Sequence, residues 1–152
     1  MNDIFIHYGS SVYYPMKVRP VKNSSCRNKP TGGFWMSPIE SLLGWKDWCI
    51  IENFNCEKLS ESFQLKFREY SKIFIINNLV DLNKLPTFIH YNKYAQINDE
   101  FIDFEKISQG YDAIWLTAKG EVSTCWITSR PSLYGWDCES VLVFNRDCIY
   151  QI

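Results

Sequence analysis

The hydrophobic positions along this chain form short runs, each long enough for one strand or one short helix. Runs rich in Ile, Phe and Val, with alternating or continuous apolar residues, predict strands. The expected strands cover residues 4–8, 33–37, 62–68, 73–77, 112–116, 139–145 and 148–151. Apolar Trp45 and Cys49 lie at helical spacing after a Ser-Pro pair that is typical of a helix start, and they predict a helix over 38–52.

Two stretches lack this clear periodicity. Residues 11–31 are rich in Ser, Asn, Pro and Lys and predict a long loop, which at this length is typical of a binding or lid loop. Residues 80–110 predict short helices and loops that end near Gly110. The pattern favours an α+β protein with compact mixed and antiparallel sheets and short flanking helices. Because no repeat or linker divides the chain, we expect a single domain over 1–152.

Composition narrows the class of function. The chain has 152 residues, of which 46% are hydrophobic and 16% aromatic, and a chain of this length buries roughly two-thirds of its unfolded surface. Its 16 Lys and Arg against 17 Asp and Glu give a formal net charge of −1, which excludes a global basic footprint for nucleic acid. Basic residues do gather in the first loop, where a solvated surface is the favoured explanation and a local basic edge the alternative: Lys17, Arg19, Lys22, Arg27 and Lys29.

The cysteines and the first residues of the chain indicate the cellular compartment and whether the protein binds a metal. The six cysteines include no C-x-x-C pair, and the two histidines lie far apart, so no metal-ligand spacing is present and we expect no metal. Cys49 and Cys148 fall within apolar patterns and are expected to be reduced, buried thiols. The start lacks the basic and apolar regions of a secretory signal, and no apolar run reaches about 18 residues. These features predict a cytoplasmic protein without a membrane partner.

Candidate chemistry gathers at the two ends of the chain. His7 closes the first apolar run, and Gly9 and Ser10 follow it, so a polar ring and an accessible backbone are expected at one strand end. After the polar loop, the next apolar segment carries Trp35 and then the serine that begins the expected helix. Glu139 opens the last strongly apolar run, which places a carboxylate at the start of a core strand.

The order of these segments resembles the ADP-ribosyltransferase fold of the diphtheria-toxin and poly(ADP-ribose) polymerase branch. The matching segments are His7-x-Gly9-Ser10, Gly33-Phe34-Trp35-Met36-Ser37, Trp48-Cys49 and Glu139, and they cover about half of the chain. The Gly-Gly-aromatic-Trp-x-Ser and Gly-Trp-x-x-Trp-Cys patterns are also similar to small uncharacterised bacterial and phage proteins, which favours a bacterial or phage effector.

The resemblance implies that NAD is bound without a Rossmann fingerprint and cleaved at the bond between nicotinamide and ribose. The ADP-ribose would pass to a macromolecular acceptor, protein or nucleic acid, or to water. Glu139 is then the catalytic carboxylate that stabilises the oxocarbenium-like sugar. The resemblance implies cofactor-binding roles for His7 (ribose), Gly9 (nicotinamide amide), Ser10, Trp35, Ser37 and Trp48, with an indole stacked on the ring.

Other interpretations of the same residues stay open. The protein is equally readable as a non-catalytic, aromatic-rich binding module or a sensor of NAD-derived nucleotides on the same fold. Trp45 and Trp48 fit a core stripe, Ser37 fits a helix cap, and Glu139 fits a solvated strand end. Asp137 stands where arginine-modifying members carry Gln or Glu, so arginine is not the favoured acceptor.

Overall fold

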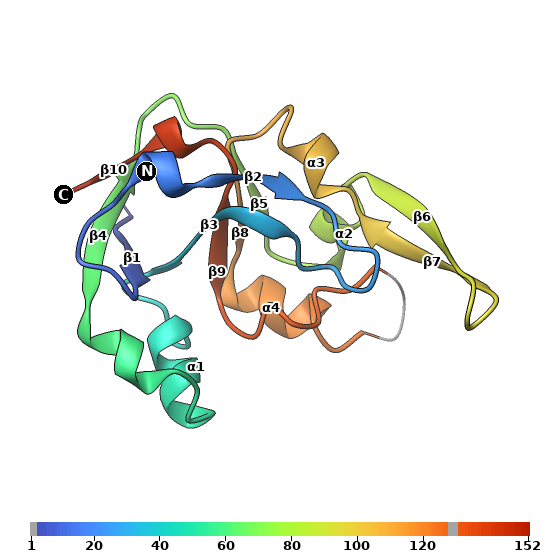
Figure 1. The fold of residues 1–152 in the computed structure, drawn as a ribbon, viewed down its shortest axis with the longest axis horizontal. Helices are drawn as coiled ribbons and strands as arrows, with labels where there is room; N and C mark the ends of the chain where they lie inside the picture. Colours follow the sequence, from blue (N-terminus) through green and yellow to red (C-terminus); the bar gives the residue numbers. More distant parts are fainter. Residues whose placement is uncertain (1–2, 128–130) are drawn as a thin grey trace.

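A curled mixed sheet forms the centre of the molecule in the computed structural model, which describes residues 3–127 and 131–152 (Figure 1). The strands follow the order β10-β4-β1-β3-β9-β8-β5, and β2 pairs with β3 beside this path. The strands of this sheet are β1 (Phe5–Tyr8), β2 (Arg19–Lys22), β3 (Thr31–Pro38), β4 (Ser62–Phe67), β5 (Ile73–Ile76), β8 (Ala113–Leu116), β9 (Ser140–Val143) and β10 (Ile149–Gln151). Only β5 and β8 run parallel among the described pairs. The predicted α+β class is confirmed.

Short helices and one hairpin complete the fold. The α-helices are α1 (Trp45–Ile51), α2 (Leu79–Leu82), α3 (Phe104–Ile107) and α4 (Ala118–Thr124), and the 3-10 helices are η1 (Pro15–Lys17), η2 (Cys56–Ser60) and η3 (Arg146–Cys148). Strands β6 (Thr87–Asn92) and β7 (Ile97–Ile102) form a separate hairpin that projects from the body (Figure 1). Among the described residues, no helix has the length and apolar character needed to cross a membrane.

The sheet buries a hydrophobic cluster on each face. One cluster includes Ile114 and Leu142, and the other includes Phe5 and Val141, all fully buried. Leu142 and Val141 are neighbours on β9, and their side chains point to opposite faces because strand residues alternate. Each fully buried side chain of this size contributes roughly 1.5–3 kcal/mol through removal from water. Both faces of β9 are therefore covered.

The sheet splits along one edge of β3, and this split positions the site. On that edge β1 pairs only with the end of β3, through Phe5 with Pro38 and Ile6 with Ser37, whereas β2 pairs with its beginning. Within the described chain, no strand pairs with the middle of β3 on this edge. The opposite edge of the same segment pairs with β9.

The strand predictions are confirmed, but the helix prediction over 38–52 is wrong in its first half. The helix begins at Trp45, with Gly44 at its N-cap. Ser37 and Pro38 belong to β3 instead, because they pair with β1 in the sheet. A tertiary strand pairing has overridden a local helix-start signal.

The two stretches without clear periodicity each contain strands that the sequence pattern did not predict. The predicted loop 11–31 contains β2, which includes Pro20 and pairs irregularly at the sheet margin. Region 80–110 contains the β6–β7 hairpin as well as α2 and α3. Its strands are rich in aromatic and β-branched residues, but the turn between them contains no glycine to mark it.

Candidate ligand-binding site

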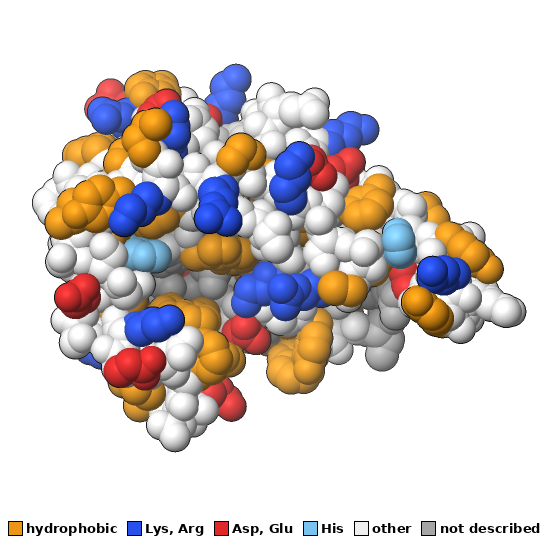
Figure 2. All heavy atoms as spheres, in the orientation of Figure 1, with side chains coloured by type: hydrophobic (Ala, Val, Ile, Leu, Met, Phe, Trp, Pro, Cys, Tyr) orange, Lys and Arg blue, Asp and Glu red, His pale blue; other side chains and the backbone are white. Residues whose placement is uncertain are grey.

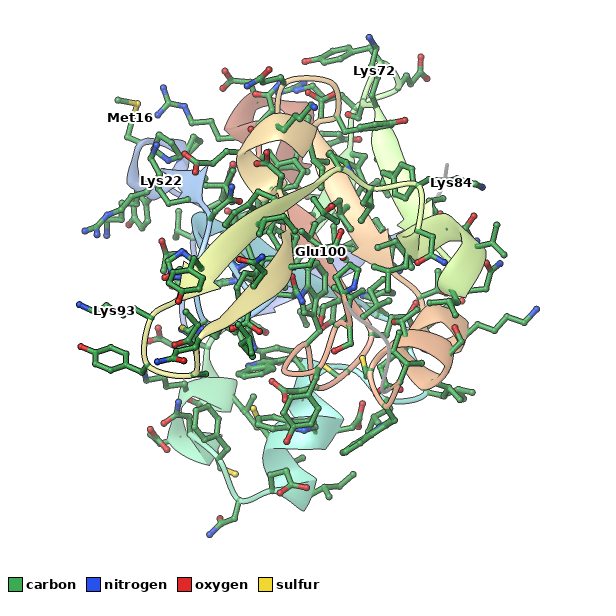
Figure 3. All side chains as sticks on the ribbon, turned by 90° about the vertical axis from the view of Figure 1, so that its right-hand side faces the viewer. Met16, Lys22, Lys72, Lys84, Lys93 and Glu100 are labelled. Carbon is green, nitrogen blue, oxygen red and sulfur yellow. The ribbon has the colours of Figure 1, made fainter. Side chains whose placement is uncertain are left out.

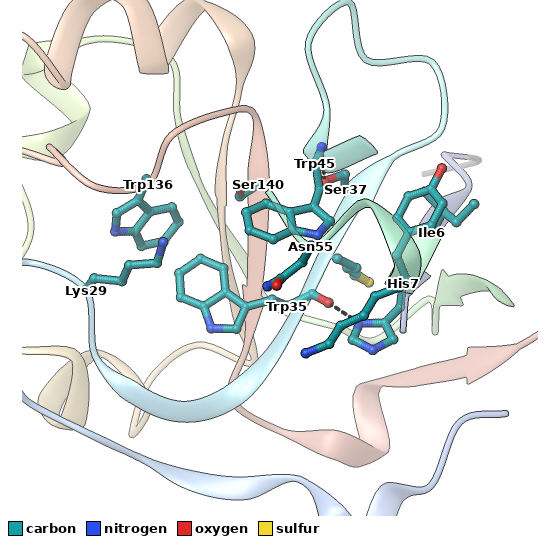
Figure 4. Close-up of a pocket in the computed structure, with 12 residues that line it drawn as sticks. Ile6, His7, Lys29, Trp35, Ser37, Trp45, Asn55, Trp136 and Ser140 are labelled. Atoms are coloured by element: carbon teal, nitrogen blue, oxygen red, sulfur yellow. Dashed lines mark hydrogen bonds between the residues drawn. The ribbon is translucent and has the colours of Figure 1, made fainter. Parts of the chain in front are cut away.

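A cavity of about 310 Å³ opens where β1 separates from β3 (Figure 4). The residues around it come from β1, β3, α1, η2, the start of β9 and three connecting segments. They are Ile6, His7, Tyr8, Lys29, Trp35, Met36, Ser37, Trp45, Asn55, Lys58, Trp136 and Ser140. Figure 2 shows a hollow in the left half of the molecule, bordered by hydrophobic side chains, a histidine and Lys or Arg side chains.

Indole rings form the fixed walls of the cavity. Trp35 and Trp136 meet edge to face, with ring centroids 4.8 Å apart. The Trp136 ring is anchored because its Nε1 donates a hydrogen bond to the carbonyl of Asn28 at 2.8 Å, and both residues are buried. Buried, hydrogen-bonded indoles have few alternative rotamers, so this wall is preformed for a flat ligand.

The third indole that lines the cavity is that of Trp45 rather than that of Trp48. Trp48 is stacked on Trp45 with centroids 5.1 Å apart and an interplanar angle of 18°, and it also packs against Phe54 at 5.5 Å. Trp48 is not among the residues that line the cavity, whereas Trp45 is. The resemblance pointed to Trp48, but in the structure Trp48 supports the indole that faces the cavity.

The start of α1 fixes the position of Trp45. The buried hydroxyl of Ser37 accepts a hydrogen bond from the backbone N–H of Trp45 at 3.1 Å. The Asp47 carboxylate accepts another from the backbone N–H of Gly44 at 3.1 Å. A helix start leaves N–H groups without intrahelical partners, and here a side chain on β3 satisfies one of them. Ser37 is therefore both a cap for α1 and a lining residue.

Two lysines give the cavity a positive margin. The Lys29 ammonium donates to the carbonyl of Gly135 at 2.6 Å and to the Asp137 carboxylate at 3.0 Å, and it lies 5.6 Å from the centroid of Trp35. Lys58 on η2 is exposed and forms no ion pair with the side chains that the structure describes. Lysine at the margin of an apolar cavity suits a ligand that carries phosphate.

His7 bridges the split in the sheet. Its Nδ1 donates to the backbone carbonyl of Trp35 at 2.7 Å, in place of a strand-to-strand hydrogen bond. The ring packs against Phe34 and Phe63, with centroids 4.5 and 5.3 Å away. Burial lowers the pKa of His7, and the hydrogen bond to Trp35 opposes this only in part. His7 lines the cavity, with one ring nitrogen already engaged.

Glu139 lies at the sheet but outside the cavity lining. Its carboxylate accepts a hydrogen bond from the indole Nε1 of Trp115 at 3.0 Å, and the residue is only 9% exposed. The alternative of a solvated strand end is therefore wrong. The next residue, Ser140, does line the cavity. Since side chains alternate along a strand, Ser140 faces the cavity while Glu139 faces Trp115 on the other side of the sheet.

Gly9 and Ser10 also lie away from the cavity lining. The Gly9 backbone is left-handed, with φ of 96°, and its N–H donates to the carbonyl of Glu61 at 2.9 Å. The Ser10 hydroxyl bonds the backbone of Val12 and stabilises a local turn. Of the predicted binding residues, the structure brings His7, Trp35 and Ser37 together around the cavity.

Several lining residues were given no ligand-binding role by the motif resemblance. They are Ile6, Tyr8, Lys29, Met36, Trp45, Asn55, Lys58, Trp136 and Ser140. Asn55 and Lys58 belong to the connection between α1 and β4, and Trp136 lies far along the chain from β1. The aromatic content was the available signal for Trp136, but its position depends on tertiary packing.

No family model, curated protein or solved structure matches this chain. The resemblance to ADP-ribosyltransferases therefore rests on the motif residues alone. Within the described ranges, no group of three or more His, Cys, Asp or Glu side chains is placed to hold a metal ion.

Proposed function

We propose that this protein binds NAD or a closely related nucleotide in the cavity between β1 and β3. The observation that carries this proposal is an indole-walled cavity with two lysines at its margin. A nicotinamide or adenine ring would lie against Trp45, and a cationic nicotinamide would gain further from the indole face. Asn55 and Ser140 supply polar groups for a ribose. Lys58 is the cation available to the diphosphate, because Lys29 is already paired with Asp137.

The size of the cavity limits how much of the nucleotide it takes. A volume of about 310 Å³ is at the lower end of the range for small-molecule sites. We therefore expect one nucleoside-sized half of NAD inside, and the diphosphate at the open margin near the lysines. This arrangement separates two contributions to the affinity for NAD. One is ring stacking inside the cavity, and the other is the charge interaction of the diphosphate at its margin.

Ring stacking is tested with two matched Trp→Ala variants. Trp45→Ala removes an indole from the cavity wall, and Trp126→Ala removes an exposed indole outside it. Stacking on an aromatic ring is worth roughly 1–3 kcal/mol, so Trp45→Ala should raise the Kd for NAD about 10-fold or more. Isothermal titration calorimetry gives the Kd directly. Equal affinities of the two variants, or no binding by the wild type, would overturn the proposal.

Charge at the margin is tested by comparing two ligands. Lys58→Ala should weaken NAD but leave nicotinamide riboside unchanged, because only NAD carries the diphosphate. Lys119→Ala, an exposed lysine on α4, is the control. The difference between the effects of Lys58→Ala on NAD and on nicotinamide riboside should shrink at high salt, since exposed charges are screened. An equal effect of Lys58→Ala on both ligands would place the diphosphate elsewhere.

A second candidate function is transfer of ADP-ribose, in which the motif resemblance gives Glu139 the catalytic role. Glu139 is nearly buried and precedes the cavity residue Ser140 in the sequence, but its carboxylate bonds Trp115 on the other side of the sheet. In this reaction the bond from ribose C1′ to nicotinamide breaks, and nicotinamide leaves with the electron pair. An acceptor oxygen or nitrogen, from a protein, a nucleic acid or water, then bonds C1′ and releases its proton. A carboxylate would stabilise the developing positive charge on the sugar.

Glu139→Gln separates transfer from binding alone. The amide keeps an oxygen that can accept from Trp115 but removes the charge. If Glu139 is catalytic, nicotinamide release should fall about 100-fold or more while the Kd for NAD stays within a few-fold. Nicotinamide release at the wild-type rate would rule out Glu139 as the catalytic residue. If the wild type binds NAD but releases no nicotinamide, the protein acts as a nucleotide sensor rather than a transferase.

A further inference from the structure

The β6–β7 hairpin stands apart from the main sheet. Its strands pair in one uninterrupted register from Thr87 with Ile102 to Asn92 with Ile97. Among the described strands, only β7 pairs with β6, so the outer edge of β6 has no strand beside it. Figure 3 looks onto the hairpin, where Glu100 lies on β7 and Lys93 at the turn points away from the body. An exposed edge of this kind is a ready template for another strand.

Strand β6 has none of the features that usually protect a sheet edge. Its sequence, Thr-Phe-Ile-His-Tyr-Asn, contains no lysine, no carboxylate and no proline, and its pairing has no bulge. Natural edge strands are generally blunted by such charges, prolines or bulges. In addition, Ile89 is 62% exposed and Tyr91 is 58% exposed. Both residues have odd numbers on one strand and therefore share a face.

We propose that β6 pairs with β6 of a second copy of this chain, in antiparallel fashion about a two-fold axis. The two hairpins would then form a continuous sheet in the order β7-β6-β6-β7. Ile89 and Tyr91 of both copies would meet on one face of this sheet and remove apolar surface from water. An interface of this symmetry is isologous, so a single strand supplies both halves.

The distribution of charge selects β6 rather than β7 for this contact. Strand β7 carries Asp99 and Glu100 on opposite faces, so pairing two β7 edges would place carboxylates of both copies on each face of the joined sheet. Like charges directly opposite one another on a sheet are destabilising. Pairing two β6 edges opposes no formal charges. A six-residue edge is also small for an interface, so the expected dimer dissociates in the range of roughly 1–100 µM.

Sedimentation velocity over a concentration series tests this proposal on the full chain. The wild type should shift from monomer to dimer with rising concentration. Ile89→Lys and Tyr91→Lys should each remain monomeric, because each places two like charges at the contact. Tyr94→Lys adds the same charge at the hairpin turn, where the side chain is 90% exposed, and should dimerise as the wild type does.

Thermal melts of each variant would confirm that the fold is retained, and the two β6 variants serve as independent tests of the same edge. A wild type that stays monomeric up to about 500 µM, well above the range expected for a small interface, would overturn the proposal. So would a dimer that persists in both Ile89→Lys and Tyr91→Lys. Since β6 shares no residue with the cavity, NAD affinity should be unchanged in these variants.

Discussion

At the scale of single residues, a side-chain hydrogen bond ties each of His7 and Glu139 to the sheet. His7 donates to the Trp35 carbonyl, and Glu139 accepts from the Trp115 indole. Both contacts meet the general requirement that buried polar groups find partners. The sequence marked the two residues through their positions at strand ends. It did not reveal these partners, because Trp35 and Trp115 are distant in the chain and reach them only through strand pairing.

The partly buried imidazole of His7 should make stability depend on pH. Burial holds the pKa of His7 below its ordinary value of 6.5, so the unfolded chain binds this proton more readily than the folded chain. The contribution of neutral His7 to the free energy of unfolding is therefore complete above pH 6.5. It is lost as the pH falls through that value toward the lower pKa of the folded state. Urea unfolding of the wild type should show lower stability at pH 5.5 than at pH 7.5.

His7→Gln should reduce this pH dependence, since it removes the titrating ring. His90→Gln is the matched control, because it removes the other histidine, which is exposed on β6, and should leave the wild-type slope unchanged. If His7→Gln and the wild type lose equal free energy of unfolding between the two pH values, the partly buried imidazole is not the cause.

At the scale of elements, the close approach of α4 to β5 depends on a glycine. Gly120 is buried in the first turn of α4, where its N–H donates to the Thr117 hydroxyl that caps the helix. A Cβ at this position would overlap the carbonyl oxygen of Ile76 at the end of β5. The helix can therefore lie against the strand only when this residue has no side chain. A single-sequence pattern does not distinguish such a glycine from a helix breaker.

Gly120→Ala should destabilise the protein although alanine favours helices. The added methyl group forces α4 away from the backbone of β5, an overpacking cost of roughly 1–3 kcal/mol. Gly110→Ala is the control, because its Cβ would lie 4.0 Å from the nearest atom, the carbonyl oxygen of Ile107. That variant should be neutral or stabilise by up to about 1 kcal/mol. Urea unfolding measures both, and equal effects would contradict a close contact between α4 and β5.

At the scale of the whole molecule, the cysteines form no disulfide, and four of the six are buried as small apolar side chains. All six are free; Cys49, Cys125, Cys138 and Cys148 are buried, and Cys26 and Cys56 are exposed. Burial raises the pKa of Cys125 and Cys148 to about 12 and that of Cys138 to about 11. A thiol with such a pKa is hardly ionised at neutral pH and reacts slowly. The predicted burial of Cys49 and Cys148 is confirmed.

Thiol labelling should therefore divide the cysteines into two classes. A thiol-specific reagent at neutral pH should label Cys26 and Cys56 quickly in the native protein, and the remaining four only after denaturation. Mass spectrometry of the labelled chain identifies the sites. Because the structure contains no disulfide, a reductant should leave the Tm unchanged; a fall of several degrees would contradict this.

The sequence by itself determined the α+β class, the strands of the main sheet other than β2, and the burial of Cys49 and Cys148. These follow from local periodicity and from the preference of apolar side chains for the interior. It also brought out His7, Trp35 and Ser37, which lie on strands that become neighbours in the sheet. Only the tertiary structure decided which side chains face the cavity. Trp45 replaced Trp48 at the wall because Trp48 stacks behind it, and Ser140 replaced Glu139 because alternation along β9 turns the carboxylate to the other face. Such choices depend on strand register and helix start, which long-range pairing sets and local sequence does not.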